Sequence, residues 1–326
     1  LLHEIVSIAL KRPVWGMQVH APGWVLFVTN EDPRERLTAR LREIMQEMRL
    51  SEAEQRCVLE HFIPLDLTGT GAKLVHVRDG NIEQTSLAGE LVRQYRSDPP
   101  ALVVFDPLVS FGASEAMVND NEQALINVGR YLVRELGCCV RFVHHTGKQA
   151  ARDGVVDQYA GRGGSALADG CRMVAVLATW DGKTPLPAGC KAGENVSIFR
   201  LERPKLSYAR PNQPTIWIRR EGFAYQHFIE FPQSPDQVAA GRVAQLERYL
   251  EHCVSGRPAQ YHTRRTLEDS AAMIGMTRAE IRGALATLEA QRRVVDAPVP
   301  PMLRRGGRKA FLCPSDLAAG FGEVAS

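Results

Sequence analysis

The chain of 326 residues is long enough for two domains, and its apolar fraction of 44% and charged fraction of 24% are those of an ordinary globular protein. Its net charge of +3 is too small to indicate a nucleic-acid partner by itself, and no apolar run approaches the roughly 18 residues that span a bilayer. The seven cysteines form no C-x-x-C pair, which excludes a disulfide framework or a zinc site of that kind and indicates a reducing cytoplasm.

Apolar periodicity predicts an α/β organisation for the first two-thirds of the chain. Helices are predicted at residues 1–10, 34–48, from the Ser51–Glu54 capping box onward, at 86–95 and at 122–136 before Gly137. Strands are predicted at residues 24–29, 61–65, 74–77, 101–105 and 140–143. Residues 147–164 are expected to form a long functional loop without secondary structure.

After this loop the pattern predicts a helical turn, a buried strand and three further strands. They cover residues 165–170, 173–180, 196–201, 215–219 and 223–228. A segment rich in Gly, Pro and Lys at residues 181–195 is expected to be exposed, and residues 232–235 indicate a linker. We therefore expect a first domain over residues 1–231, built around a mostly parallel sheet.

Residues 236–315 are predicted to form a second, smaller domain. Helices are expected at 242–253, at 266–274 with Thr266 as its cap, and from the Thr277–Glu280 capping box onward, followed by a hairpin between Val294 and residues 310–312. This order is that of a winged helix-turn-helix. Eleven basic and five acidic side chains lie between residues 257 and 309, a local excess of six positive charges that favours DNA as a partner.

Each of three predicted parallel strands ends in an acid or a histidine. Glu31 follows the first strand, Asp106 ends the second, and His144 and His145 follow the third. Because the carboxyl ends of parallel strands line one crevice, we expect these side chains to lie together. An aspartate there would hold Mg²⁺, and a glutamate would activate the water that attacks a phosphate. A turn or helix cap is the structural alternative for both acids, and Asp32 fits the cap better than Glu31.

Histidines and cations extend this set. One of His144 and His145 would contact a γ-phosphate or the attacking water, and the alternatives are a satisfied buried imidazole or a metal site, for which the clustered ligands are lacking. Arg162 lies between glycines, where it would reach across a subunit boundary to neutralise charge in phosphoryl transfer, or serve as an ordinary exposed arginine. Lys205 is a second cationic candidate for binding the cofactor.

The second domain offers candidate DNA contacts. If it folds as a winged helix, Ile281 and Leu285 face inward, whereas Arg278 and Arg282 face outward toward a major groove. The basic tip of the hairpin would reach an adjacent groove or the phosphates, and it comprises Arg304, Arg305, Arg308 and Lys309. The alternative is a winged helix that contacts protein.

A phosphate-binding loop of the form G-x-x-x-x-G-K-[ST] is absent from the sequence. Such a loop precedes the first helix of a nucleotide-binding core, and here the chain opens within a predicted helix, at Leu1 rather than at methionine. We interpret this as a loop that lay immediately upstream, and a complete protein without the loop is the alternative. The chain by itself is expected to bind ATP poorly, which makes its activity doubtful.

Four stretches, VLFVTNEDP at 25–33, VVFDPL at 103–108, FVHHTGK at 142–148 and GRGGSAL at 161–167, follow one another as they do in a known family. With PKLSY at 204–208, their order and spacing resemble the RepA-like hexameric helicases of plasmid and mobile-element replication. These helicases are a branch of the RecA-fold, AAA-family ATPases. The resemblance covers roughly residues 1–228.

The resemblance implies a RecA-like P-loop core, ATP and Mg²⁺ as cofactors, DNA as a partner, and a hexameric ring that hydrolyses ATP between subunits. It places the catalytic acid at Glu31, the Mg²⁺ aspartate at Asp106, the phosphate sensor at His144 or His145, and the arginine acting in trans at Arg162. The winged helix is not obligatory in this family.

Three functions follow from these patterns. The first is an ATP-driven, ring-forming DNA helicase or translocase. The second is a DNA-binding replication initiator or regulator whose ATPase fold serves as an oligomerisation switch. The third is a metal-dependent hydrolase that uses Asp106 and the two histidines.

Overall fold

The structure is a computed structural model that describes residues 1–113, 117–161, 163–209, 213–303 and 309–321. The chain divides into two compact units, Leu1–Pro232 and Gln233–Ser326, and each is described by itself. Among the described residues, no helix combines the length and the apolar character needed to cross a membrane.

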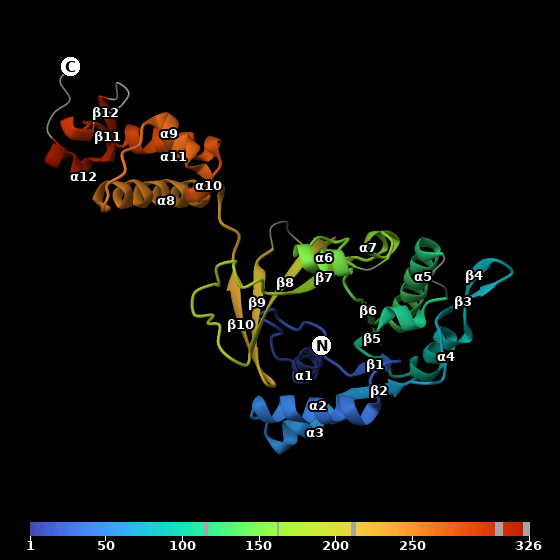
Figure 1. Ribbon diagram of the computed structural model, residues 1–326. Coiled ribbons are helices and arrows are strands. Elements are labelled where there is room, and N and C mark those ends of the chain that lie inside the picture. The colour runs from blue at the N-terminus through green and yellow to red at the C-terminus, as the bar shows by residue number, and fades with distance from the viewer. Residues whose placement is uncertain (114–116, 162, 210–212, 304–308, 322–326) are drawn as a thin grey trace. The chain divides into compact units, whose positions relative to one another are not determined.

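Four parallel strands form the central sheet of the first unit, in the order β2-β1-β5-β6. They are β1 (Val25–Thr29), β2 (Phe62–Asp66), β5 (Leu102–Asp106) and β6 (Cys139–Phe142). Helices on one face are α1 (Leu2–Ala9), α2 (Arg34–Glu47) and α3 (Glu52–His61). On the other face lie α4 (Ser86–Tyr95) and α5 (Val118–Leu136), as Figure 1 shows.

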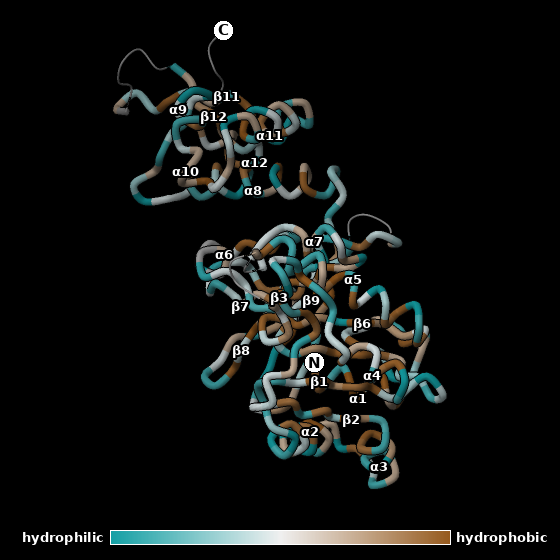
Figure 2. The backbone as a smooth tube through the Cα atoms, turned by 90° about the vertical axis from the view of Figure 1, so that its right-hand side faces the viewer, coloured by the Kyte–Doolittle hydropathy of each residue, from teal (hydrophilic) through white to brown (hydrophobic). Residues whose placement is uncertain are grey.

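The strands read as continuous apolar runs because both faces of the sheet are covered. In β1, Leu26 and Val28 are buried against α4 and α5, whereas Val25 and Phe27 are buried against α1, α2 and α3. The apolar stretches of the backbone can be followed in Figure 2. The predicted strands and helices of this region are confirmed within a few residues, including the Ser51 capping box.

Three elements of this region differ from the sequence prediction. The hairpin of β3 (Val75–Arg78) and β4 (Asn81–Gln84) was predicted only in its first strand, and its Asp79-Gly80 turn has positive φ at both residues, 49° and 78°. Helix α5 begins four residues before the predicted start. The predicted loop at 147–164 contains the short helix α6 (Lys148–Asp153), and α7 (Ala166–Gly170) follows it.

A second, antiparallel sheet has the order β10-β9-β8-β7. Its strands are β7 (Met173–Thr179), β8 (Val196–Leu206), β9 (Thr215–Glu221) and β10 (Ala224–Glu230). The expectation that 173–180 would be a buried strand was wrong, because β7 lies at the edge of this sheet with Met173 and Leu177 45% and 53% exposed. These four strands form a second sheet that is separate from the parallel one.

The second unit is a group of helices followed by a two-stranded hairpin. The helices are α8 (Pro235–Ser255), α9 (Arg264–Asp269), α10 (Ala271–Ile274), α11 (Arg278–Ala290) and α12 (Ser315–Ala318), and the strands are β11 (Val294–Pro298) and β12 (Ala310–Pro314). Leu246, Leu267 and Ile281, from three of these helices, are fully buried in one core.

Two helix boundaries of the second unit were predicted wrongly. Helix α8 begins at Pro235, seven residues before the predicted start, because Ser234 and Gln237 form a capping box within the expected linker. The predicted helix at 266–274 is two short helices that break at Ser270, and its N-cap is Thr263 rather than Thr266.

Candidate functional site

The carboxyl ends of β1, β5 and β6 lie in line at one edge of the parallel sheet. Thr29 of β1 pairs with Asp106 of β5, and Phe105 of β5 pairs with Phe142 of β6. The Asn30 N–H donates to the Asp106 carbonyl oxygen at 3.1 Å, which continues the ladder past the end of β1. The polar residues that follow each strand are therefore brought to one edge, as parallel strands require.

Thr29 shapes the turn that presents Glu31. Its side chain is buried, and Oγ1 accepts hydrogen bonds from the backbone N–H groups of Glu31 at 3.1 Å and Asp32 at 3.2 Å. The Glu31 side chain is exposed, and its carboxylate has no hydrogen bond or ion pair with any residue that the structure describes. The turn therefore presents a carboxylate that is available to a ligand or to water.

Asp32 has a different role from its neighbour. Its carboxylate forms ion pairs with Arg40 at 2.6 Å and with Arg36 at 3.5 Å, both on α2. The expectation that Asp32 would cap α2 was wrong, since the N-cap is Pro33 and the carboxylate that accepts from the first helical N–H, that of Arg34 at 3.2 Å, belongs to Asp66 of β2. Asp32 instead pairs with two arginines of α2, whereas Glu31, the other acid of the turn, has no ion-pair partner among the described residues.

Asp106 is a partly buried carboxyl at the end of β5. Burial raises the pKa of Asp106 above its ordinary value, and the negative charges of Glu31 and Asp32 raise it further, while the amino group of Leu1 and then His145 act in the opposite direction. Together with the pairing of Thr29 with Asp106, these electrostatic effects place the acids at the same strand ends. A concentration of negative charge around a partly desolvated carboxyl favours a divalent cation, which would relieve both the repulsion and the burial cost.

His144 and His145 follow β6 and line a cavity of about 530 Å³. The side chain of His144 is partly buried and that of His145 is exposed. Thr146, the next residue, forms an isolated antiparallel bridge with Gly161. The strand end that carries the histidines is thereby joined to the glycine-rich segment that follows α6.

The structure describes one of the two cationic candidates of the first unit. Arg162 lies outside the described residues. The Lys205 ammonium group, on β8, donates to the carbonyl oxygens of Ala168 at 2.8 Å and Asp169 at 2.9 Å. Lys205 therefore caps the C-terminal end of α7 and does not line the histidine cavity.

Within the described ranges, no three His, Cys, Asp or Glu side chains are grouped so that they could hold a metal ion by themselves. Mg²⁺ does not need such a group, because it keeps several waters and binds through one or two carboxylates together with substrate phosphates. Asp106, with its raised pKa and the neighbouring charge of Glu31, fits that kind of site.

The predicted DNA contacts on α11 are exposed, and each is already paired. The Arg278 and Arg282 side chains are 64% and 61% exposed, and they form ion pairs with Asp269 at 3.2 Å and Glu268 at 2.8 Å on α9. Lys309 is also exposed. The remaining predicted contacts, Arg304, Arg305 and Arg308, lie outside the described residues.

One residue beside the site was not identified from the sequence. Glu122 on α5 is buried, lines the same cavity as the two histidines, and accepts two hydrogen bonds from backbone N–H groups more than 40 residues away. The available signal was an acid at the start of an amphipathic helix, which is the ordinary place for a solvated charge.

The first part of the chain matches a known family. Residues 1–151 match the family described as an AAA domain. With the parallel sheet, this match confirms the predicted α/β class and fits a RecA-like core. No curated protein matches the chain.

Two solved structures are similar to the chain at low identity. A DnaB-like replicative helicase, described with its interactions with primase, aligns with a TM-score of 0.43 and 13% identity over 62% of this chain and 51% of that chain. A KaiC-like protein from the hyperthermophilic archaeon Pyrococcus horikoshii aligns with a TM-score of 0.40 and 11% identity over 69% and 80%. The chain thus spans about half the length of the DnaB-like structure.

Proposed function

We propose that this chain carries the ATPase core of a DNA helicase or translocase that acts in plasmid or mobile-element replication. It works as a cytoplasmic ring, proposed to be hexameric, that hydrolyses ATP between neighbouring subunits. One observation carries the proposal, namely the convergence of the unpaired Glu31, the Asp106 carboxyl with its raised pKa, and His145 at one edge of a parallel sheet.

Asp106 and Glu31 would have different roles in the hydrolysis of ATP. Mg²⁺, when bound, would neutralise charge on the phosphates of ATP. Asp106 would hold this ion, directly or through water, because its carboxyl is partly desolvated and faces other negative charges. Glu31 would accept a proton from the attacking water, since its carboxylate is the one at this turn not occupied by an arginine.

The histidines and cations would respond to the phosphate or stabilise its charge. His144 or His145 would hydrogen-bond the γ-phosphate or the attacking water, from the end of the strand next to Asp106. Arg162 would act across the subunit boundary on a neighbour's nucleotide. Lys205 is a weaker candidate for the same role, because it would first have to release two carbonyl oxygens of α7.

The second unit is proposed to bind DNA as a winged helix. Its element order supports this reading, with α11 as the recognition helix and the β11–β12 hairpin as the wing. Arg278 and Arg282 would contact DNA only after exchanging their carboxylate partners for phosphates. The basic tip from Arg304 to Lys309 would supply further phosphate contacts.

Replacing Arg305 and Arg308 with alanine in the full chain is expected to weaken binding to duplex DNA and to flatten its salt dependence. Each lost phosphate contact lowers the slope of log K against log salt by about 0.9. Replacing Glu268 with glutamine and Asp269 with asparagine is the matched variant, and it should strengthen binding because it frees Arg282 and Arg278. Fluorescence anisotropy at several salt concentrations measures both, and unchanged slopes and affinities would indicate that this unit contacts protein instead.

ATP turnover by the full-length gene product, with and without DNA, tests the proposed function. A motor is expected to release phosphate several-fold faster when single-stranded or duplex DNA is present. Turnover that DNA does not change, combined with ATP-dependent oligomerisation, would support the replication initiator or regulator with an ATPase switch. Absence of turnover under all conditions would contradict the ATPase assignment itself.

A further inference from the structure

Glu122 is a buried carboxylate that the proposed chemistry does not use. It lies near the start of α5 and is 5% exposed. Its Oε1 accepts from the Gly164 N–H at 2.7 Å, and its Oε2 accepts from the Leu167 N–H at 3.0 Å. A buried charge is costly unless it is hydrogen-bonded, and here each oxygen has a separate backbone donor.

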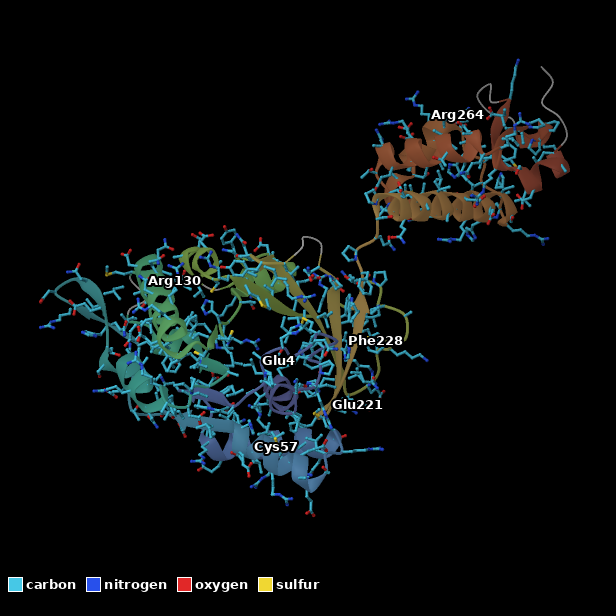
Figure 3. The ribbon with its side chains drawn as sticks, turned by 180° about the vertical axis from the view of Figure 1, so that it is seen from behind. Glu4, Cys57, Arg130, Glu221, Phe228 and Arg264 are labelled. Carbon is cyan, nitrogen blue, oxygen red and sulfur yellow. The ribbon has the colours of Figure 1, made fainter. Side chains whose placement is uncertain are left out.

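Glu122 is the first of three residues on one stripe of α5 that hold α7. Ile126, four residues later, lies against Gly170, where an added Cβ would come within 2.8 Å of it. Arg130, four residues further and labelled in Figure 3, donates to the Gly170 carbonyl oxygen at 3.3 Å. The carboxylate is thus at the N-terminal end of α7 and the guanidinium at its C-terminal end, which satisfies groups that a helix leaves unpaired.

Two glycines allow the segment before α7 to approach this stripe. Gly163 has φ +134°, a backbone conformation that residues with a side chain rarely adopt. A Cβ there would collide with Oε1 of Glu122. A Cβ on Gly164 would collide with Oδ1 of Asn119. The glycine pair is therefore required for the contact with Glu122.

The other end of the same segment is fixed to the histidine-bearing strand end. Gly161 forms a bridge with Thr146, and the Gly147 N–H donates to the Ala160 carbonyl oxygen at 3.0 Å. A Cβ on Gly161 would lie 3.0 Å from His144 Cδ2. Gly161 and residues 163–165, here together called the glycine loop, thus lie against the histidines at one end and against α5 at the other.

We propose that Glu122 is a positioning residue that fixes the glycine loop against α5. It thereby sets where this loop meets a neighbouring subunit's nucleotide. The proposal rests on the proposed function, in which the glycine loop supplies Arg162 in trans. Glu122 itself touches neither nucleotide nor water in this role, and it acts through the two backbone N–H groups that it accepts.

Hydrogen exchange tests the positioning without any reference to ATP. In Glu122→Gln one acceptor oxygen is replaced by an NH₂ group, which cannot accept from a backbone N–H. Peptides covering residues 160–170 are expected to exchange at least about tenfold faster, with little change elsewhere in the chain. Asp120→Asn is the matched control, because it removes an exposed carboxylate from the same turn of α5. Equal exchange in both variants would overturn the proposal.

Subunit mixing tests the consequence for catalysis in the full-length gene product. Glu122→Gln is expected to lower kcat about tenfold with the KM for ATP unchanged, because a small misplacement of the loop affects the transition state. A mixture of equal amounts of the Glu122→Gln and Glu31→Gln proteins should recover to roughly a quarter of wild-type turnover. At some of the subunit interfaces, one subunit then supplies Glu31 and its neighbour supplies an intact loop.

The outcomes separate the two proposals. A mixture that stays at about half the rate of Glu122→Gln alone, or a defect in KM instead of kcat, would show that Glu122 does not position a group acting in trans. A wild-type protein without ATP turnover would refute the proposed function, and the exchange experiment would still decide whether Glu122 holds the glycine loop.

Discussion

Replacing Glu31 with glutamine is expected to lower the rate of ATP hydrolysis by about 100- to 10,000-fold while nucleotide binding is retained. The Thr29 hydroxyl accepts from the Glu31 backbone N–H and so fixes the turn after β1, and the Glu31 carboxylate has no hydrogen-bond or ion-pair partner among the described residues. Glutamine has nearly the same shape but cannot accept the proton of the attacking water. Phosphate release at saturating ATP, with nucleotide affinity measured separately, gives the two quantities.

The matched control for this variant is Glu35→Gln. Glu35 is an exposed acid in the first turn of α2, four residues from Glu31. Its replacement should leave turnover within about twofold of the wild-type value. If Glu31→Gln retained wild-type turnover, the carboxylate at the end of β1 would have no part in the chemistry.

The second large effect is expected when Asp106 is replaced with asparagine, which should stabilise the apo protein. The folded protein raises the pKa of this carboxyl, through burial and then the charge of Glu31, so it binds the proton more tightly than the unfolded chain does. The ionised carboxylate therefore destabilises the fold at neutral pH, and this cost disappears as the pH falls through the raised pKa. The variant should melt about 2–4 °C higher at pH 7, the shift that roughly 1 kcal/mol produces.

The pH dependence of the change in stability is the control for Asp106→Asn. The stabilisation by Asp106→Asn should shrink as the pH is lowered and vanish well below the ordinary aspartate pKa of about 3.9, where the carboxyl is protonated in both states. Asp181→Asn should have the opposite sign, because backbone hydrogen bonds from Thr184 and Lys183 lower the pKa of Asp181 to about 2. Melting curves that show Asp106→Asn to be less stable at pH 7 would contradict the raised pKa of Asp106.

The strands that carry the site could be predicted from the sequence because helices cover both faces of their sheet. In β1 and β5 every side chain faces a helix layer, so the apolar runs are unbroken and end where the polar cluster begins. The carboxyl edge of a parallel sheet then brings Glu31, Asp106 and the histidines together without further information. The turn at Asp79-Gly80 and the short polar strand after it were not predicted, although an Asp-Gly pair is a local turn signal.

Contacts between distant segments could not be predicted in the same way. Glu122 meets Gly164 and Leu167 across 42 and 45 residues, and nothing local distinguishes it from a solvated acid at a helix start. The ion pairs of Arg278 and Arg282 with α9 depend on how two helices pack, so the sequence indicated that these cations are exposed but not that carboxylates pair with them. The exposure of β7 depends on its edge position in a sheet whose order only the fold reveals.

Electron paramagnetic resonance of Mn²⁺ bound with ATP to the full-length gene product tests directly whether Asp106 holds the metal ion of a nucleotide site. Mn²⁺ replaces Mg²⁺ at oxygen ligands, and its signal reports whether the ion is bound to the protein. We expect a bound Mn²⁺–ATP signal in the wild type and in Glu31→Gln. In Asp106→Asn we expect this signal to be lost, or the binding to be at least about tenfold weaker. Equal Mn²⁺–ATP binding in the wild type and in Asp106→Asn would contradict a nucleotide site at the carboxyl edge of β1, β5 and β6.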